Sequence, residues 1–132
     1  MTDFRKLVVW EKAHALAVRI HSLAAGMRKS QFASVRKQMI RAGESVPTNI
    51  AEASRQESRR DFARFLRYAL NSASELEYHL ILATDIGAIA RAEGETLIAA
   101  VTEVRKMLHG LLRRVSVASK RTSAQQARQR ET

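Results

Sequence analysis

The chain has 132 residues, 45% of them hydrophobic, and it contains no cysteine. Its length and apolar content indicate a single folded domain, and the lack of cysteine excludes disulfides, thiolate metal sites and a cysteine nucleophile. Lys and Arg outnumber Asp and Glu by 23 to 13, so the net charge of +10 makes a polyanion the first class of partner to consider.

The first predicted helix covers residues 8–25 and ends at Gly26. Apolar residues recur in it at intervals of three and four, as they do on the buried face of a helix. These residues are Trp10, Ala13, Ala17, Ile20 and Ala24. Charges interrupt the N-terminal segment, so we predict no signal peptide and no membrane span, and we expect a cytoplasmic location.

The second predicted helix begins near Ser30, a residue suited to cap a helix N-terminus, and continues to about Ala53. Its apolar face consists of Val35, Met39, Ala42 and Val46. Pro47, the only proline, lies inside this helix and removes one hydrogen-bond donor. Gly43, four residues earlier, has no side chain and leaves room for the proline ring. The pattern predicts either one kinked helix or two short helices that meet at Ser45.

The third predicted helix begins after Ser58 and Asp61, which resemble a capping box, and ends at Gly87. Its apolar face consists of Phe62, Leu66, Ala69, Ala73, Leu76, Leu80 and Ala83. A fourth helix shows the same alternation of three- and four-residue steps. The residues of that face are Leu97, Val101, Val104, Leu108, Leu111 and Val115.

Four amphipathic helices with short connections bury these faces best as an all-α, antiparallel up-and-down four-helix bundle. The position of Pro47 predicts that the second helix of this bundle is kinked. We expect the bundle domain to cover residues 1–118. Residues 119–132 lack apolar periodicity and are predicted to form a basic, disordered C-terminal tail.

Some apolar residues lie off these faces, where a monomeric bundle would leave them exposed to solvent. The first helix carries Val9, Leu16 and Leu23 in this way, and the third carries Tyr78, Leu82, Ile86 and Ile89. A second apolar stripe on one helix is typical of a subunit interface. We therefore predict a homo-oligomer that uses the stripe of the third helix.

Polar residues form a pattern of their own around the proline. Arg41, Ser45, Asn49 and Glu52 are spaced to share one face of the second helix, while Ser72, Glu75 and His79 share a face of the third. Extending the apolar face beyond Val46 places Asn49 at an inward position. If the two helices are antiparallel neighbours, their polar stripes meet. We predict a hydrogen-bonded structural lock rather than a reactive site, because buried polar networks are commonly structural.

Three stretches of the sequence resemble the 23S rRNA intervening-sequence protein family, which is related to the accessory variability protein of diversity-generating retroelements. They are "LVVWEKAHAL", "RKQMIRAGESVPTNIAEASR" and "SRRDFARFLRYALNSASELEYHL". The specific matches are Gln38, Arg41 and Ala42; Ser45, Val46, Asn49, Ile50, Ala51 and Glu52; Ser58, Asp61 and Phe62; and Ser72, Glu75, Leu76 and Glu77. The resemblance implies a four-helix bundle that assembles as a ring-like homopentamer. It also implies a basic surface suited to nucleic acid, and it supplies no catalytic residue.

Sequence motifs give little support to an enzyme or to a bound cofactor or metal. Glu11 and His14 form one Glu-x-x-His unit, but a di-iron bundle needs a second copy and two further carboxylates. His21 lies two turns after His14, and His79 and His109 are isolated. We find neither a glycine-rich phosphate loop nor a Ser-His-Asp arrangement.

Two functions remain open. In the first, the protein is a nucleic-acid-binding accessory factor or scaffold that contacts RNA or DNA, alone or beside a nucleic-acid-processing protein. The candidate contacts are Arg36, Lys37, Arg55, Arg59, Arg60, Arg113, Arg114, Lys120 and Arg121. In the second, the protein is a structural or protein-interaction module whose charge serves solubility. Residues 61–92 are nearly neutral, so the first hypothesis places the positive field on the other helices and the tail.

Overall fold

The computed structural model describes residues 3–131, without the side chains of residues 117–120 and 122. Over this range the regular structure is entirely helical. A short 3-10 helix, η1 (Phe4–Lys6), precedes α1 (Val8–Ala25), and a second, η2 (Ser30–Phe32), precedes α2 (Ala33–Ser54). The chain then forms α3 (Arg59–Asp85) and α4 (Arg91–Glu131). The predicted all-α class is confirmed.

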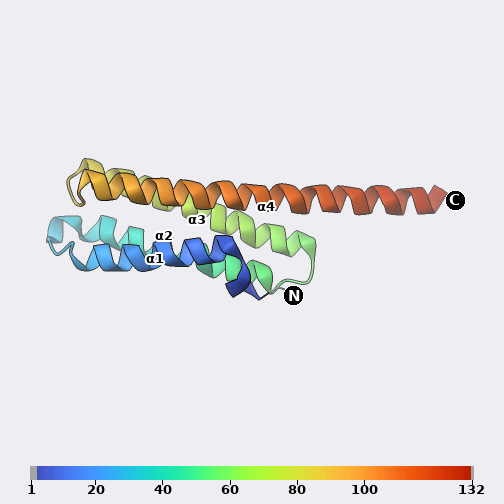
Figure 1. Cartoon of the computed structure of the whole chain (residues 1–132), viewed down its shortest axis with the longest axis horizontal. Coiled ribbons are helices and arrows are strands. Elements are labelled where there is room, and N and C mark those ends of the chain that lie inside the picture. The colour runs from blue at the N-terminus through green and yellow to red at the C-terminus, as the bar shows by residue number, and fades with distance from the viewer. Residues whose placement is uncertain (1–2, 132) are drawn as a thin grey trace.

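The helices pack side by side as a bundle, and the colour gradient of Figure 1 shows the chain direction reversing from each helix to the next. α2 packs against α1 and α3, while α4 packs against α3 and α1. α1 ends at Ala25 before Gly26, where the sequence predicts. Within the described residues, we find no helix that is both long and apolar enough to cross a bilayer.

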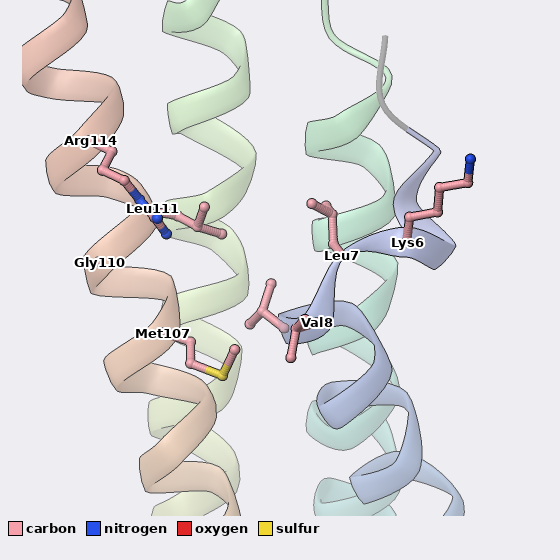
Figure 2. A pocket seen from close by; sticks show the side chains of 8 residues that line it. Lys6, Leu7, Val8, Met107, Gly110, Leu111 and Arg114 are labelled. Atoms are coloured by element: carbon pink, nitrogen blue, oxygen red, sulfur yellow. The ribbon is translucent and has the colours of Figure 1, made fainter.

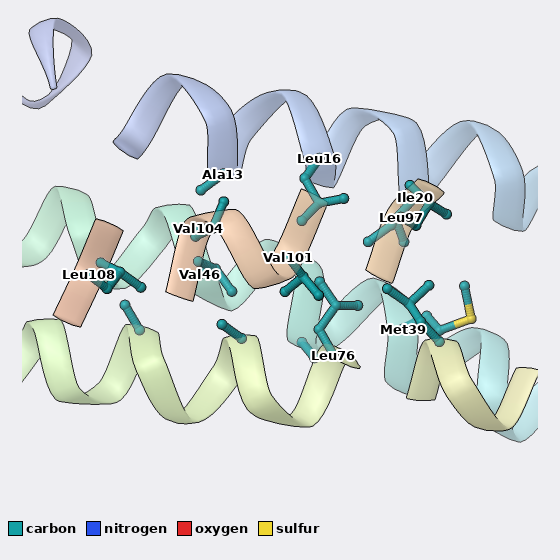
Figure 3. Packing of buried hydrophobic residues seen from close by; sticks show 14 of the residues in the cluster. Ala13, Leu16, Ile20, Met39, Val46, Leu76, Leu97, Val101, Val104 and Leu108 are labelled. Atoms are coloured by element: carbon teal, nitrogen blue, oxygen red, sulfur yellow. The ribbon is translucent and has the colours of Figure 1, made fainter. Parts of the chain in front are cut away.

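The core lies where the four apolar faces meet (Figure 3). Its fully buried side chains include Ile20 of α1, Met39 and Ile50 of α2, Leu76 of α3 and Leu97 of α4. Most predicted apolar positions of α2, α3 and α4 belong to the core, which confirms the periodicity argument for a helical bundle, whereas Val115 of the predicted α4 face lies outside the core.

Two parts of the predicted interface stripes are wrong. Ile89 is only 6% exposed and belongs to the core, because the turn after α3 folds back so that the Ile89 N–H donates to Ala83 O. Val9 and Leu16 are also buried, whereas Trp10 is only partly buried. Small alanines occupy much of the predicted α1 face, so the larger off-face side chains of α1 fill the remaining core volume.

α2 passes through Pro47 as one helix from Ala33 to Ser54, so the chain does not divide into two helices at Ser45. Gly43 is buried, and an added methyl group there would lie 3.3 Å from Ile20 Cδ1. The glycine thus relieves the proline ring and lets α1 lie close to α2.

The two predicted N-caps differ in outcome. Ser58 caps α3, since its hydroxyl accepts a 3.1 Å hydrogen bond from the backbone N–H of Asp61. Ser30 does not cap α2, because residues Ser30–Phe32 form η2 and α2 begins only at Ala33.

α4 continues as a helix to Glu131 and runs past the ends of the other helices, where the sequence predicts a disordered tail (Figure 1). The absence of glycine and proline after Gly110 allows the helix to continue, and Ala, Gln, Arg and Lys favour it. Apolar periodicity, on which the prediction of disorder rested, reports packing and not backbone propensity. The domain boundary at residue 118 remains a prediction.

Candidate nucleic-acid interface

A basic groove lies between the beginning of α3 and the middle of α4. We define it by its lining residues, Arg59, Arg60, Ala63, Arg67, Leu112, Val115 and Ser116. Its volume is ≈ 220 Å³. Three of its seven lining residues are arginines and none is acidic. The groove therefore offers guanidinium groups beside small and apolar side chains.

The fold places these arginines through the start of α3. Ser58 fixes where the helix begins, and Arg60 and Arg67 lie seven residues apart, on one face of it. Asp61 is nearby in sequence but approaches Arg64, with an Asp61 Oδ1–Arg64 Nη2 distance of 3.5 Å. The exposed N–H groups of the first helical turn add partial positive charge at the same end. The beginning of α3 therefore favours an anion.

α4 brings more positive charge to this end of the bundle. Between Glu103 and Glu131 the sequence contains eight Lys and Arg and no Asp or Glu. Arg113 and Arg114 are exposed and follow directly after the groove residue Leu112. On the other side of α4, Arg114 and Lys6 border an apolar pocket of ≈ 440 Å³ between α4 and the start of α1 (Figure 2).

The remaining predicted nucleic-acid contacts do not lie together. Arg36 donates to the backbone carbonyl of Met27, so this half-buried side chain braces the connection between α1 and α2. The start of α2, which includes Arg36 and its exposed neighbour Lys37, lies at the opposite end of the bundle from the start of α3 (Figure 1). These two positions match the sequence criterion of positive charge but are separated from the groove by the length of α2.

The other three outlying candidates also differ from the groove residues. Arg55 forms a 2.9 Å ion pair with Glu52 and lies over the Phe4 ring, 5.5 Å from its centroid, so a carboxylate already balances its charge. Arg121 is exposed on the part of α4 beyond the bundle. The side chain of Lys120 lies outside the described residues.

Arg67 is the groove residue that the sequence prediction missed. Counting charges over residues 61–92 averages the basic start of α3 with its acidic later part and hides the cluster. The signal was present in the seven-residue spacing from Arg60 to Arg67, which places both side chains on one face.

The polar side chains around Pro47 come together between α2 and α3. Ser45 Oγ and Ser72 Oγ share a hydrogen bond of 2.7 Å, and Arg41 donates to a Glu75 carboxylate oxygen over 2.7 Å. We call these four residues, together with Asn49, the polar cluster. The Arg41–Glu75 pair is largely exposed, so its stabilisation is at most about 1 kcal/mol. The function of the cluster as a structural lock remains a prediction.

Two residues of the predicted structural lock, Asn49 and Glu52, do not have the surroundings that the sequence predicts. Asn49 is half-buried and donates to Ser45 O and Ser45 Oγ within its own helix, at 2.9 and 3.0 Å, while Ile50 takes the inward position. Glu52 pairs with Arg55, one turn later in the chain, and contacts no member of the cluster through a described hydrogen bond. The step from Val46 to the next core residue is four, not three, which moves Asn49 to the edge of the interface.

Asn49→Ala is expected to lower the free energy of unfolding by about 1 kcal/mol, because it removes the amide that bonds the partly buried Ser45 hydroxyl. Urea unfolding measures this difference. Thr48→Ala is the matched control: Thr48 also bonds a carbonyl four residues back, at 2.8 Å, but it is exposed, so its change should stay within about 0.5 kcal/mol. Equal stability of Asn49→Leu and the parent chain would contradict the proposed role of Asn49.

His79 lies beside the polar cluster with its Nδ1 buried and without a hydrogen-bond partner among the described residues. Burial lowers the pKa of His79, the Glu75 carboxylate opposes this by raising the pKa, and Arg41 lowers it further. Because the charged form is disfavoured, the ring is neutral at physiological pH. A neutral, half-buried imidazole fits a structural environment.

Two of the other histidines have neighbours of different kinds. His14 stacks on Trp10 with ring centroids 4.9 Å apart, and His21 Nε2 lies 2.6 Å from Glu44 Oε1. Among the described side chains, we find no group of three or more His, Asp or Glu residues able to hold a metal ion. The guanidinium groups of the basic groove are able to bind anions.

Comparison with protein families gives a match to the model of the 23S rRNA-intervening sequence protein over residues 5–110. The chain belongs to this family. A crystal structure of a protein of unknown function from the S23 ribosomal protein family of Bacteroides thetaiotaomicron VPI-5482 is also similar. The two chains are 36% identical with a TM-score of 0.75, and the alignment covers 80% of this chain and 98% of that one. No curated protein matches the sequence.

The 23S rRNA-intervening sequence family match includes the polar cluster and the α3 side of the groove. It ends at residue 110, before Leu112, Arg113 and Arg114. The groove is therefore completed by a part of α4 that lies outside the matched range.

Proposed function

We propose that this protein is a non-enzymatic, homo-oligomeric accessory or scaffold protein that binds RNA or DNA through phosphate contacts. The observation that carries the proposal is the basic groove, in which Arg59, Arg60 and Arg67 lie together without an acidic lining residue. Arg113 and Arg114 extend the same field along α4. Its framework is an antiparallel four-helix bundle, kinked at Pro47, in the cytoplasm.

Binding at the basic groove is electrostatic and tolerant of sequence. Aromatic residues make up only 5% of the chain, and the described ring contacts of Phe4, Trp10 and Phe65 are with other side chains of the protein. Arginines that contact phosphates fix the position of a nucleic acid without distinguishing its bases. A nucleic-acid-processing protein bound to the same complex would then supply the selectivity.

The direct test is a salt titration of the full chain against single-stranded RNA, single-stranded DNA and duplex DNA. We expect binding at about 50 mM salt that weakens steeply as salt rises, with a log–log slope of about −0.7 per phosphate contact on single strands. Undetectable association with all three at the lowest salt would instead favour the structural module.

A second candidate function, that of a protein-interaction module, is favoured by the outer face of α3. Tyr78 is 59% exposed, and the exposed Ile81 and the half-buried Leu82 follow it on α3; Ile86, directly after the helix, is 46% exposed. Large exposed apolar side chains grouped on one helix are typical of an interface. We propose that a further copy of the chain covers this face, and the resemblance to the family implies a pentamer.

Tyr78→Glu is expected to reduce the mass of the assembly without loss of helix, because Tyr78 lies outside the core and a buried carboxylate would oppose association. Light scattering and circular dichroism measure the two effects. Glu95→Gln, at an exposed position of α4, serves as a control that should leave the mass unchanged. A stable monomer of the parent chain at micromolar concentration would overturn the proposed assembly.

A further inference from the structure

We propose that the part of α4 beyond the bundle binds in the major groove of duplex DNA. This part, residues 117–131, is called the C-terminal extension below. The inference rests on the proposed function and adds to it a particular element and a particular form of nucleic acid. It concerns a segment outside the matched family range, which ends at residue 110.

The C-terminal extension stands apart from the rest of the molecule. α4 continues to Glu131, and Figure 1 shows it running beyond α1, α2 and α3. Arg121 and every residue from Ser123 to Glu131 are exposed. A helix that runs beyond its neighbours gains little from tertiary packing, and such helices are marginal in water. The described side chains of the extension, Arg121 and residues 123–131, are exposed and accessible to a partner.

Positive charge along α4 has a helical period that continues into the C-terminal extension. Arg114, Arg121 and Arg128 follow one another at intervals of seven residues, and all three are exposed. Seven residues are nearly two full turns, so these side chains form one row with steps of about 10.5 Å. A duplex presents phosphates at regular intervals along both edges of its grooves, so a regular row of guanidinium groups can contact several of them. The partner that matches this row is a regular polyanion.

The other side chains of the C-terminal extension suit entry into a groove. From residue 123 to 129 the sequence is Ser-Ala-Gln-Gln-Ala-Arg-Gln, with no large apolar residue. The major groove of B-DNA is about 12 Å wide and accepts an α-helix of this kind, and glutamine amides pair with the edge of adenine. Gln125 and Gln126 are exposed and are the candidates for such contacts.

The same features argue against other anionic partners. A helix that binds a membrane surface needs an apolar face to enter the lipid, and the sequence of the extension contains a single large apolar residue, Val117. A-form RNA has a deep, narrow major groove that side chains cannot enter, so double-stranded RNA does not fit. Single strands present no groove. Duplex DNA is the partner that satisfies both the charge row and the shape.

The first test replaces two arginines of the row. Arg121→Glu with Arg128→Glu, in the full chain, is compared with Arg28→Glu with Lys29→Glu, two exposed residues at the opposite end of the bundle that change the net charge equally. Binding is measured by fluorescence anisotropy with a 20-base-pair DNA duplex, the matching RNA duplex and one single DNA strand. We expect the first variant to lose about tenfold or more in affinity for duplex DNA, with a salt slope reduced by about 0.9 for each lost contact. The control pair should change that affinity much less.

The second test separates a bound helix from a flexible basic tail. Ser123→Pro interrupts the helix while keeping every charge, and Ser123→Ala is its control. We expect the proline variant alone to lose affinity for duplex DNA. We also expect the helical circular dichroism signal of the parent chain to increase when duplex DNA is added, since binding stabilises the extension.

The outcomes distinguish this inference from the proposed function. If no nucleic acid binds, both fail. If single strands, RNA duplex and DNA duplex bind equally and the Arg121/Arg128 variant binds like its control, the inference is overturned. The proposed binding of nucleic acid at the basic groove then stands. Equal binding by Ser123→Pro and Ser123→Ala would also overturn it, because a disordered tail would then suffice. Loss confined to anionic lipid vesicles, with DNA binding unchanged, would point to a membrane surface and reject the inference.

Discussion

Gly94→Ala is expected to lower the free energy of unfolding by about 1–3 kcal/mol, although alanine is the better helix former. An ideal Cβ at residue 94 would lie 2.1 Å from Thr84 Oγ1 and 3.1 Å from Thr84 Cβ. Thr84 has little freedom to move away, because it is 7% exposed, its β-branched side chain is stiff, and its hydroxyl donates to Leu80 O over 2.7 Å. The end of α3 and the start of α4 must therefore separate.

Gly110→Ala is the matched control, in the same helix and with the same substitution. An ideal Cβ at residue 110 would meet only Arg113 Nη2, at 3.9 Å, so we expect the ordinary gain of about 0.5–1 kcal/mol for replacing glycine inside a helix. In urea unfolding, we expect the change in the free energy of unfolding to have opposite signs for the two variants. Thr84→Ala combined with Gly94→Ala should recover part of the loss, since it removes the nearest atom. Stabilisation by both glycine replacements would show that α3 and α4 are not in close contact at Gly94.

Helix periodicity predicted the helical fold from the sequence because most core residues lie at the three- and four-residue intervals of a buried helix face. The range of α1, the cap at Ser58 and the buried faces that include Leu76 and Leu97 all rest on local rules. Local rules do not decide which of two competing stripes enters the core. On α1 the alanines of the predicted face leave core volume unfilled, and Leu16 fills it. How much volume remains depends on the side chains that the other three helices place in the core.

The candidate site was harder to predict because it depends on which helices become neighbours. The contacts Ser45–Ser72 and Arg41–Glu75 could be anticipated, since both pairs follow from antiparallel packing of two polar stripes. Arg67 of α3 lines the groove together with residues of α4. To predict this, one must know against which side of α3 the helix α4 packs. Charge counts alone could not separate Arg36, which braces a connection, from the arginines of the groove.

Arg60→Glu combined with Arg67→Glu is expected to reduce affinity for RNA and DNA about 100-fold or more at 0.1 M salt, which corresponds to about 2.7 kcal/mol. The variant removes two guanidinium groups from one groove and places two carboxylates there, so attraction becomes repulsion at short range. Salt would screen these charges less inside a groove than on open surface. Fluorescence anisotropy with single-stranded and duplex probes measures the loss, which should be similar for unrelated base sequences because phosphates are common to all of them.

The control for this variant is again Arg28→Glu with Lys29→Glu, which gives the same net charge at the opposite end of the bundle. If net charge alone attracts nucleic acid, both pairs should weaken binding equally, and the groove would have no special role. If the groove is the site, the control should lose little affinity at 0.1 M salt, because that end lies farther away than the screening length of about 10 Å. The groove pair should also weaken single-stranded and duplex binding together, since contacts at Arg60 and Arg67 are made to phosphates and do not depend on the form of the nucleic acid.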